Sequence, residues 1–420
     1  MSPSINLYKQ LSKNKLFKKT INFNLNRIKL VLNKLGNPEK KLNNVINILG
    51  SSGKYSLLTS LKYFIEENNQ TTSAYISPSL KDIKERFWIG KRNLSHNEIK
   101  KSIKIIEKQN ISLTVFEVLT VIFILNAAKK KNDYNLIEAG ALFAKDSTNV
   151  FSSPLIQAVV NINKQHLNFL KKKTLDEVIY QKVGFLNQNT RIYIGKQIPP
   201  TLKKIKLYLS KNQSKKIFSN SWKLIKINKT YFYKDKKVKI CLNNKNIKSR
   251  ALFENLCMAI KIALDLKIRK KIIIRAIPKI FFEGRVQYLK KGKLIKNLNK
   301  NEKIIIDGSH AEVDASNLAN YLKTIKKSKY GIWGMIKNKE PDLFIKKFKG
   351  VFKKIITIPI QDQQNSLSSK LLLKIAKKNN FNAYQAKSIE QAIKKVMSKE
   401  KKIIVIFGSL YLIGHALNKN

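Results

Sequence analysis

Apolar and polar residues alternate along this chain in two patterns: short apolar runs, and longer stretches with apolar residues at helical spacing. Residues 45–49 form an apolar run that ends at Gly50 and is typical of a buried strand. After Lys54, the apolar residues fall on one face of a helix, at Leu57, Leu58, Leu61, Phe64 and Ile65. The pattern therefore predicts a strand, a turn over residues 50–56 and a helix.

The same alternation continues to the C-terminus. Further strands are predicted at residues 74–76, 134–138, 157–162, 303–307, 330–335, 354–359 and 403–407. Helices are predicted at residues 28–35, 95–109, 115–128, 174–183, 251–266, 315–322, 343–348, 371–378 and 389–396. Residues 205–250 are predicted to form short antiparallel strands. Strands that alternate with helices indicate an α/β fold with a parallel sheet covered on both faces. The alternation restarts after a junction at residues 281–285, which indicates a second domain.

Composition bears on the partners of the protein. The 420 residues, 43% of them hydrophobic, are enough for two or three domains with substantial cores. The net charge of +58 comes from 84 Lys and Arg against 26 Asp and Glu, and such a balance is typical of nucleic-acid-binding proteins. However, the lysines are scattered through every segment, and the abundance of Ile, Asn and Lys is expected of coding DNA poor in G and C. We therefore interpret the charge as a solvated surface and expect no specific nucleic-acid partner.

Cysteine content and the length of apolar runs bear on location. Cys241 and Cys257 form neither a metal-binding pattern nor a disulfide framework, which fits a reducing cytoplasm. The N-terminus is basic but lacks the apolar segment of a secretory signal. The longest uncharged apolar run, residues 118–128, is too short to span a bilayer. We therefore expect a cytoplasmic protein that does not bind membranes.

The turn at residues 50–56 reads Gly-Ser-Ser-Gly-Lys-Tyr-Ser and is a candidate phosphate-binding loop. Glycines allow a tight turn whose N–H groups point at one anion, and the N-terminus of the following helix adds positive charge. The general phosphate-loop pattern has four residues between its glycines, whereas here only Ser51 and Ser52 lie between Gly50 and Gly53. From the turn alone, an ordinary connection between a strand and a helix is the alternative.

Polar residues also collect where the predicted strands end. Ser77, Glu138 and His166, like Lys54, each follow a strand of the N-terminal half. Ligands bind beyond the carboxyl ends of the strands in an open parallel sheet, so these residues are expected on one rim. The side chains of Ser77, Glu138 and His166 are suitable ligands for Mg²⁺, although this ion prefers oxygen ligands and usually keeps several water ligands. Each residue taken singly has a structural explanation as a helix cap, a turn or a surface loop residue.

Short motifs follow one another in order along nearly the whole chain. They are Gly-Ser-Ser-Gly-Lys-Tyr-Ser at 50–56, Ile-Ser-Pro-Ser-Leu at 76–80, Phe-Glu-Val at 116–118, Ile-Glu-Ala-Gly at 137–140, Asp-Ser-Thr-Asn-Val at 146–150, Gln-His at 165–166, Gln-Lys-Val-Gly at 181–184, Gly-Arg-Val-Gln at 284–287, Asp-Gly-Ser-His at 307–310 and Phe-Gly-Ser-Leu-Tyr-Leu-Ile-Gly at 407–414. In this order they resemble the motifs of the folylpolyglutamate synthase and dihydrofolate synthase family, which belongs to the Mur ligase superfamily.

The resemblance implies a fold and an activity. The fold would be a P-loop-type N-terminal ATPase domain with a parallel sheet, residues 1–284, and a smaller Rossmann-like C-terminal glutamate ligase domain, residues 285–420. The activity would be ATP-dependent addition of L-glutamate to dihydropteroate, or to the glutamate tail of reduced folates, through an acyl phosphate. The implied cofactors are ATP and Mg²⁺, and the implied partners are L-glutamate and a pterin or folate. Because the family is usually monomeric, a monomer is expected.

The resemblance also implies roles for single residues. The implied catalytic residues are Lys54, Lys182 and His166. The implied nucleotide-binding residues are Gly50, Ser51, Ser52, Gly53, Lys54, Tyr55, Ser56, Asn255, Arg285, Asp307 and His310. The implied metal ligands are Ser77, Glu138 and His166. Lys182 would be carbamylated, a reaction that needs a neutral amine and therefore a depressed pKa.

Several loop positions depart from the family pattern. Tyr55 replaces a glycine, residues 140–145 lack two glycines and an arginine, and Gln165 and Gln181 replace acids, while Lys145 offers a substitute charge. One alternative is therefore a divergent, catalytically weakened member that binds nucleotide or folate without efficient turnover. A nucleic-acid-binding protein is a third hypothesis, which rests on the charge alone.

Overall fold

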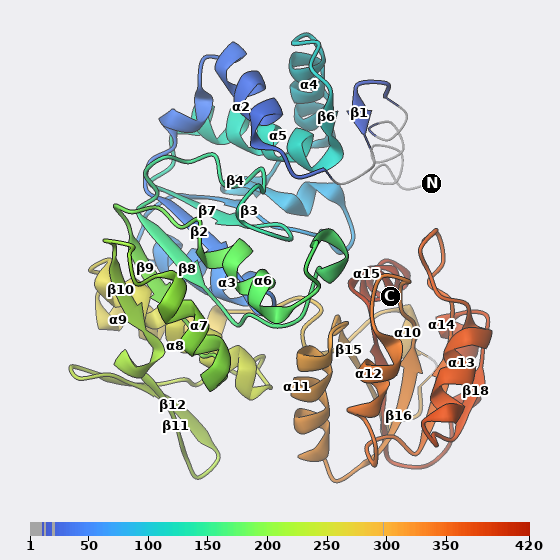
Figure 1. Ribbon diagram of the computed structural model, residues 1–420. Coiled ribbons are helices and arrows are strands. Elements are labelled where there is room, and N and C mark those ends of the chain that lie inside the picture. Colours follow the sequence, from blue (N-terminus) through green and yellow to red (C-terminus); the bar gives the residue numbers. More distant parts are fainter. Residues whose placement is uncertain (1–10, 12–13, 19–21, 297) are drawn as a thin grey trace. The chain divides into compact units, whose positions relative to one another are not determined.

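The computed structural model describes residue 11 and residues 14–18, 22–296 and 298–420. The chain divides into two compact units, which Figure 1 shows in ribbon form. The first unit comprises Met1–Asn244 and Leu252–Ile280, and the second comprises Lys245–Ala251 and Phe281–Asn420. Both units are α/β, so the fold class is confirmed. The predicted domains, with their nucleotide-binding and glutamate-ligase labels, stay a prediction.

A central sheet organises the first unit. Among the described residues it has eight strands in the order β10 (Lys215–Phe218), β9 (Arg191–Ile194), β8 (Ile156–Val159), β2 (Val45–Leu49), β7 (Tyr134–Glu138), β3 (Thr72–Tyr75), β4 (Phe87–Gly90) and β5 (Arg92–Asn93). Pairing is parallel from β10 to β3, and β4 and β5 form an antiparallel edge. Because β2, β7, β3 and β8 are parallel, the loops that follow them leave the same edge of the sheet.

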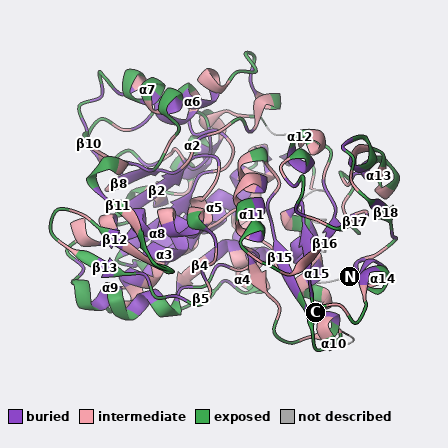
Figure 2. Cartoon of the chain, turned by 90° about the horizontal axis from the view of Figure 1, so that it is seen from below, coloured by how far each residue is buried: buried purple, intermediate pink, exposed green. Residues whose placement is uncertain are grey.

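Helices pack around this sheet. They are α2 (Leu25–Lys34), α3 (Lys54–Glu67), α4 (His96–Glu107), α5 (Val115–Lys130), α6 (Leu175–Val183), α7 (Pro199–Tyr208), α8 (Arg250–Asp265) and α9 (Lys270–Ala276). One hydrophobic cluster joins α2, α4 and α5 to the sheet, and another joins α6 and α7 to β8 and β9. In Figure 2 the buried stretches follow the strands in the interior, while outlying helices such as α9 combine exposed and buried residues.

Several helix ends form where the sequence places capping residues. Ser95 and Glu98 make a reciprocal capping box at the start of α4, as their spacing predicts. Thr174 caps α6 by accepting a hydrogen bond from the N–H of Glu177 at 3.2 Å. The helix α2 ends before residues 36–38, where Gly36 and Asn37 both adopt positive φ. These ends are therefore fixed by local sequence.

A small antiparallel sheet follows the large one along the chain. It consists of β11 (Lys223–Ile227), β12 (Thr230–Lys234) and β13 (Lys239–Cys241). The prediction of antiparallel strands over residues 205–250 is therefore correct for this part only. It is wrong before residue 223, because α7 continues to Tyr208 and β10 pairs in parallel with β9.

The second unit contains a six-stranded sheet within the part of the chain that the structure describes. Its order is β14 (Gln287–Tyr288), β15 (Glu302–Asp307), β19 (Lys402–Phe407), β16 (Ser328–Trp333), β17 (Lys354–Thr357) and β18 (Ala383–Gln385). All pairs are parallel except the edge pair of β14 and β15. Its helices are α10 (Lys293–Lys296), α11 (Glu312–Lys323), α12 (Pro341–Lys346), α13 (Ser369–Lys378), α14 (Ile389–Val396) and α15 (Leu410–Lys419). Two hydrophobic clusters cover the two faces, as predicted for a doubly covered sheet.

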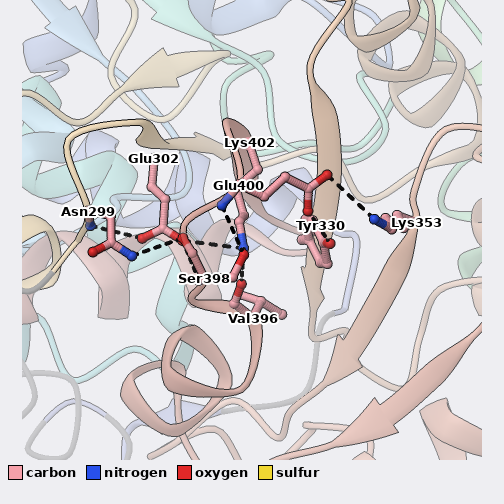
Figure 3. Close-up of polar contacts among 8 residues, drawn as sticks. All are labelled: Asn299, Glu302, Tyr330, Lys353, Val396, Ser398, Glu400 and Lys402. Atoms are coloured by element: carbon pink, nitrogen blue, oxygen red, sulfur yellow. Dashed lines mark hydrogen bonds and ion pairs between the residues drawn. The ribbon is translucent and has the colours of Figure 1, made fainter.

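A buried ion pair closes the amino end of this second sheet (Figure 3). Glu302 and Lys402 begin the neighbouring strands β15 and β19, and their charged groups lie 3.4 Å apart with side chains 0% and 1% exposed. Lys402 also donates to the hydroxyl of Ser398 at 2.5 Å and lies 4.7 Å from the ring centre of Tyr330. These contacts satisfy the two buried charges, so we assign a structural role to this end of the sheet.

Within the described residues, none of the helices combines the length and the apolar character that crossing a bilayer requires. The apolar run at residues 118–128 lies instead within α5, most of whose residues are buried in the first unit.

Candidate active site

Two glycines shape the loop between β2 and α3. Gly50 has φ +132°, and a Cβ added there would lie 2.6 Å from the side chain of Val160. Gly53 has φ +105°, and an added Cβ would lie 2.4 Å from the amide nitrogen of Asn255. Both positions therefore need glycine for conformation and for space. The strand–turn–helix predicted for this segment is confirmed.

Lys54, Glu138 and Ser77 come together beside this loop. Lys54 Nζ lies 3.8 Å from Glu138 Oε1, and the side chains are 11% and 5% exposed. The other carboxylate oxygen of Glu138 accepts the backbone N–H of Ser77 at 3.2 Å. Lys54 also donates to the carbonyl oxygen of Gly50 at 3.3 Å. These three residues therefore lie together at the edge of the sheet where β2, β3 and β7 end, as expected.

Lys182 reaches the same loop from α6. Its side chain is buried, and Nζ donates to the carbonyl oxygens of Gly50 at 2.9 Å and Ala141 at 2.6 Å. Its pKa is lowered from 10.5 to about 7, chiefly by burial and also by the nearby charge of Lys54, while Asp146 opposes the shift. Burial also raises the pKa of Asp146. The site therefore favours the neutral amine of Lys182 near neutral pH.

The chain leaving β8 runs against the candidate phosphate-binding loop and carries His166. The carbonyl oxygen of Asn161 accepts the N–H of Ser51 at 2.7 Å, and Gln165 Nε2 donates to Ser52 Oγ at 3.2 Å. His166 follows directly, in a left-handed conformation with φ +62°, and stacks on Phe169 at 6.1 Å between ring centres. Its chain neighbour Gln165 thus lies at the loop.

Asn255 is placed at the loop by α8. Its side-chain amide donates to the hydroxyl of Ser56 at 2.9 Å, and Ser56 Oγ donates to the carbonyl oxygen of Gly53 at 2.9 Å. Tyr55, which occupies a glycine position of the family pattern, lies in the first turn of α3 and is partly exposed. The predicted nucleotide-binding residues of the first unit therefore surround one loop.

The predicted residues of the second unit gather at the carboxyl ends of β15 and β19. Asp307 is buried; its carboxylate accepts the N–H groups of Val286 and Ser309, both at 2.8 Å, and burial raises its pKa. His310 Nδ1 lies 2.8 Å from the carbonyl oxygen of Gly308, and burial lowers the pKa of His310 to about 4. Arg285 opposes the rise for Asp307 through its charge.

Ser77, Glu138 and His166 are the predicted metal ligands. Among the described residues, no group of three or more His, Cys, Asp or Glu side chains is arranged to hold a metal ion. The predicted set contains only two such residues, Glu138 and His166, together with Ser77. The oxygens of Glu138 and Ser77 suit Mg²⁺, which takes few protein ligands and completes its shell with water and phosphate oxygens.

The sequence of this chain is similar to those of known enzymes. Residues 290–419 match the family profile described as "Dihydrofolate synthetase, C-terminal domain". The chain is 25% identical over 408 residues to the dihydrofolate synthase/folylpolyglutamate synthase of Buchnera aphidicola, covering 94% of this chain and 92% of that protein. The Bacillus subtilis enzyme of the same name is 27% identical over 191 residues, which cover 43% of this chain and 44% of that protein. Over nearly its whole length, this chain is therefore similar to a member of the folylpolyglutamate synthase and dihydrofolate synthase family.

Solved structures of folylpolyglutamate synthases share the fold. One from Mycobacterium tuberculosis, complexed with ADP, superposes with a TM-score of 0.87 at 17% identity, covering 99% of this chain and 97% of that chain. E. coli FolC in complex with DHPP and ADP gives a TM-score of 0.86 at 20% identity, with the same coverage. The α/β fold expected from the motifs is therefore confirmed.

The departures from the family pattern have a structural explanation at residues 140–145. Leu142, Phe143 and Ala144 are buried in the hydrophobic cluster that α6 and α7 share with the sheet. Lys145 is exposed, so its charge does not enter that cluster. The loop is thus packed as part of the core, and its carbonyl group at Ala141 holds Lys182.

Sequence reasoning missed three polar residues that support the site. Asn161 and Asn163 hold the phosphate-binding loop, and Asp146 lies close enough to Lys182 to affect its pKa. The two asparagines could have been found in the same way as Ser77, since they are polar residues that follow a strand. The predicted strand at residues 157–162 concealed that signal for Asn161, because β8 ends at Val159.

Proposed function

We propose that the protein is an ATP-dependent ligase that joins L-glutamate to dihydropteroate, to the glutamate tail of a reduced folate, or to both. A carboxylate oxygen of the pterin substrate attacks the γ-phosphorus of ATP, and ADP leaves. The amine of glutamate then attacks the acyl carbon, phosphate leaves, and a proton is released from the nitrogen. The family relationship and the convergence of Lys54, Glu138, Ser77 and Lys182 on one loop support this proposal.

The residues around the loop are proposed to act mainly by positioning charge. Lys54 contacts the outer phosphates, and the N-terminus of α3 with residues 50–56 binds their oxygens. Asn255, Arg285, Asp307 and His310 are proposed as further nucleotide contacts. Because the transferred phosphoryl group spreads negative charge over its oxygens, fixed cations and N–H groups should supply much of the rate.

Ser77 and Glu138 would hold one Mg²⁺, and His166 a second. Bound Mg²⁺ would neutralise the phosphate oxygens and orient the triphosphate. Lys182 is proposed to react with carbon dioxide to form a carbamate, which changes a cation into a carboxylate-like group. The neutral amine that this reaction requires is favoured by the lowered pKa of Lys182. Lys182 is therefore the catalytic lysine whose charge the fold controls.

The proposal is tested by phosphate release. Purified protein with ATP and Mg²⁺ should release phosphate only when both glutamate and a pterin substrate are present, and Lys54→Ala should reduce the rate by about 10²-fold or more. Release that is equal in the unaltered protein and in Lys54→Ala, with every pterin tried, would remove the proposal. ATP binding measured by calorimetry without any product would instead support the binding-only alternative, which Tyr55 and residues 142–144 motivate.

A further inference from the structure

We propose that Asn163 and Gln165 are positioning residues that hold the phosphate-binding loop ready for ATP through the hydroxyl group of Ser52. Asn163 and Gln165 lie in the segment at residues 161–165, here called the latch segment, which follows β8. The inference rests on the proposed function, because it concerns how the same loop receives the triphosphate.

The latch segment holds the backbone of the loop by hydrogen bonds. The N–H groups of Ser51 and Ser52 both donate to the carbonyl oxygen of Asn161, at 2.7 and 3.2 Å. The strands β2 and β8 are parallel neighbours, and after them Ser52 and Asn161 form an isolated antiparallel bridge. Because these two N–H groups donate to the latch segment, they do not bind the phosphate of ATP. The phosphate would instead be bound by the N–H groups of the first turn of α3, which have no acceptor within the helix.

The side chains of Ser51 and Ser52 also form hydrogen bonds with the latch segment. Ser51 Oγ donates to the carbonyl oxygen of Asn163 and accepts its N–H, both at 3.1 Å. Ser52 Oγ accepts from Asn163 Nδ2 at 3.1 Å and from Gln165 Nε2 at 3.2 Å. Ser51 and Gln165 are 8% and 7% exposed, so these bonds are largely shielded from water.

The two amide donors fix the chemical role of the Ser52 hydroxyl. A hydroxyl group has two acceptor lone pairs and one proton to donate. Asn163 and Gln165 occupy the two acceptor positions, so the proton of Ser52 is directed to an acceptor elsewhere, as a phosphate oxygen would provide. A loop that is already held in this way loses little freedom when it binds a ligand. The latch segment therefore affects the affinity for ATP.

The experiment measures the Kd of ATP with Mg²⁺, by displacement of a fluorescent ATP analogue in the absence of glutamate and pterin. The variants are Ser52→Ala, Asn163→Ala, Gln165→Met and the double variant Ser52→Ala with Asn163→Ala. The matched control is Lys164→Ala, because Lys164 lies between the two amides and its side chain is exposed. Thermal unfolding of each variant confirms that the protein tested is folded.

We expect Asn163→Ala and Gln165→Met each to raise Kd about fivefold, and Ser52→Ala about tenfold, since one and two hydrogen bonds are lost. The double variant should bind no more weakly than Ser52→Ala, because both substitutions remove the same contact. Lys164→Ala should match the unaltered protein. With substrates present, KM for ATP should rise while kcat stays within about twofold, as expected when ground and transition states lose the same interaction.

The outcomes separate this inference from the proposed function. If the unaltered protein binds no ATP, the proposed function is wrong and this inference with it. If it binds ATP and the variants bind equally well, or if the double variant shows the summed losses of its two substitutions, only this inference is wrong. Should Ser52→Ala fail to fold, Gln165→Met and Asn163→Ala still decide the question, because they leave the loop sequence intact.

Discussion

The buried amine of Lys182 predicts how the stability of the protein depends on pH. Its pKa in the folded protein is lowered from 10.5 to about 7, chiefly by burial. Between pH 7 and 10.5 the unfolded chain therefore holds a proton at this lysine that the folded protein does not. Stability must rise with pH across this window, and the full cost of burying the charge is present below pH 7.

The size of the effect follows from the same shift. Between pH 7 and pH 9 the free energy of unfolding should rise by about 2 kcal/mol through this one group. Lys182→Met keeps the length of the side chain and removes the titrating amine, so this part of the pH dependence should disappear. Lys145→Met is the matched control, since Lys145 lies on a neighbouring loop with its side chain exposed.

Urea unfolding at pH 6, 7, 8 and 9 measures this difference, in buffer free of carbon dioxide so that no carbamate forms. The difference in slope between the unaltered protein and Lys182→Met is the quantity of interest, because other titrating groups are common to both. Parallel profiles for the two proteins would refute the reasoning, as would a loss of slope in Lys145→Met.

Two further substitutions test other parts of the structure. Lys402→Met leaves Glu302 charged and buried, so the free energy of unfolding should fall by about 3–5 kcal/mol in urea titrations; adding Glu302→Leu should recover most of it, and no recovery would contradict this account. Gly53→Ala places a Cβ 2.4 Å from Asn255 at φ +105° and should weaken ATP binding at least about tenfold, whereas Gly36→Ala, at φ +77° with open space around it, should leave ATP binding unchanged. Equal ATP affinity in both glycine variants would contradict the role given to Gly53.

The alternation of apolar runs and helical spacing was sufficient to predict both parallel sheets. It failed for β9, a four-residue strand inside the first sheet, and for short strands at sheet edges. The strand β18 has three residues, two of them exposed, so it carries no apolar run. The strands β4 and β5 pair as an antiparallel edge beyond β3, and a pairing direction of this kind depends on tertiary contacts that the residue pattern does not contain.

The candidate site was predictable as far as it depends on strand ends. The positions of Lys54, Ser77 and Glu138 follow from β2, β3 and β7 ending at one edge. The contact of Lys182 with Gly50 does not follow in this way, because it depends on how α6 packs against the sheet. Only the resemblance to the family indicated Lys182. The catalytic, nucleotide-binding and metal roles assigned to these residues stay predictions.

The central claim is that the carboxylate of the pterin substrate is activated by phosphate from ATP. The most direct test supplies a pterin substrate whose carboxylate carries oxygen-18, together with glutamate, ATP and Mg²⁺, and analyses the released phosphate by mass spectrometry. This account predicts one labelled oxygen in the phosphate for each amide formed. Amide product accompanied by unlabelled phosphate would contradict an acyl phosphate, and the absence of product with all candidate pterins would contradict the ligase itself.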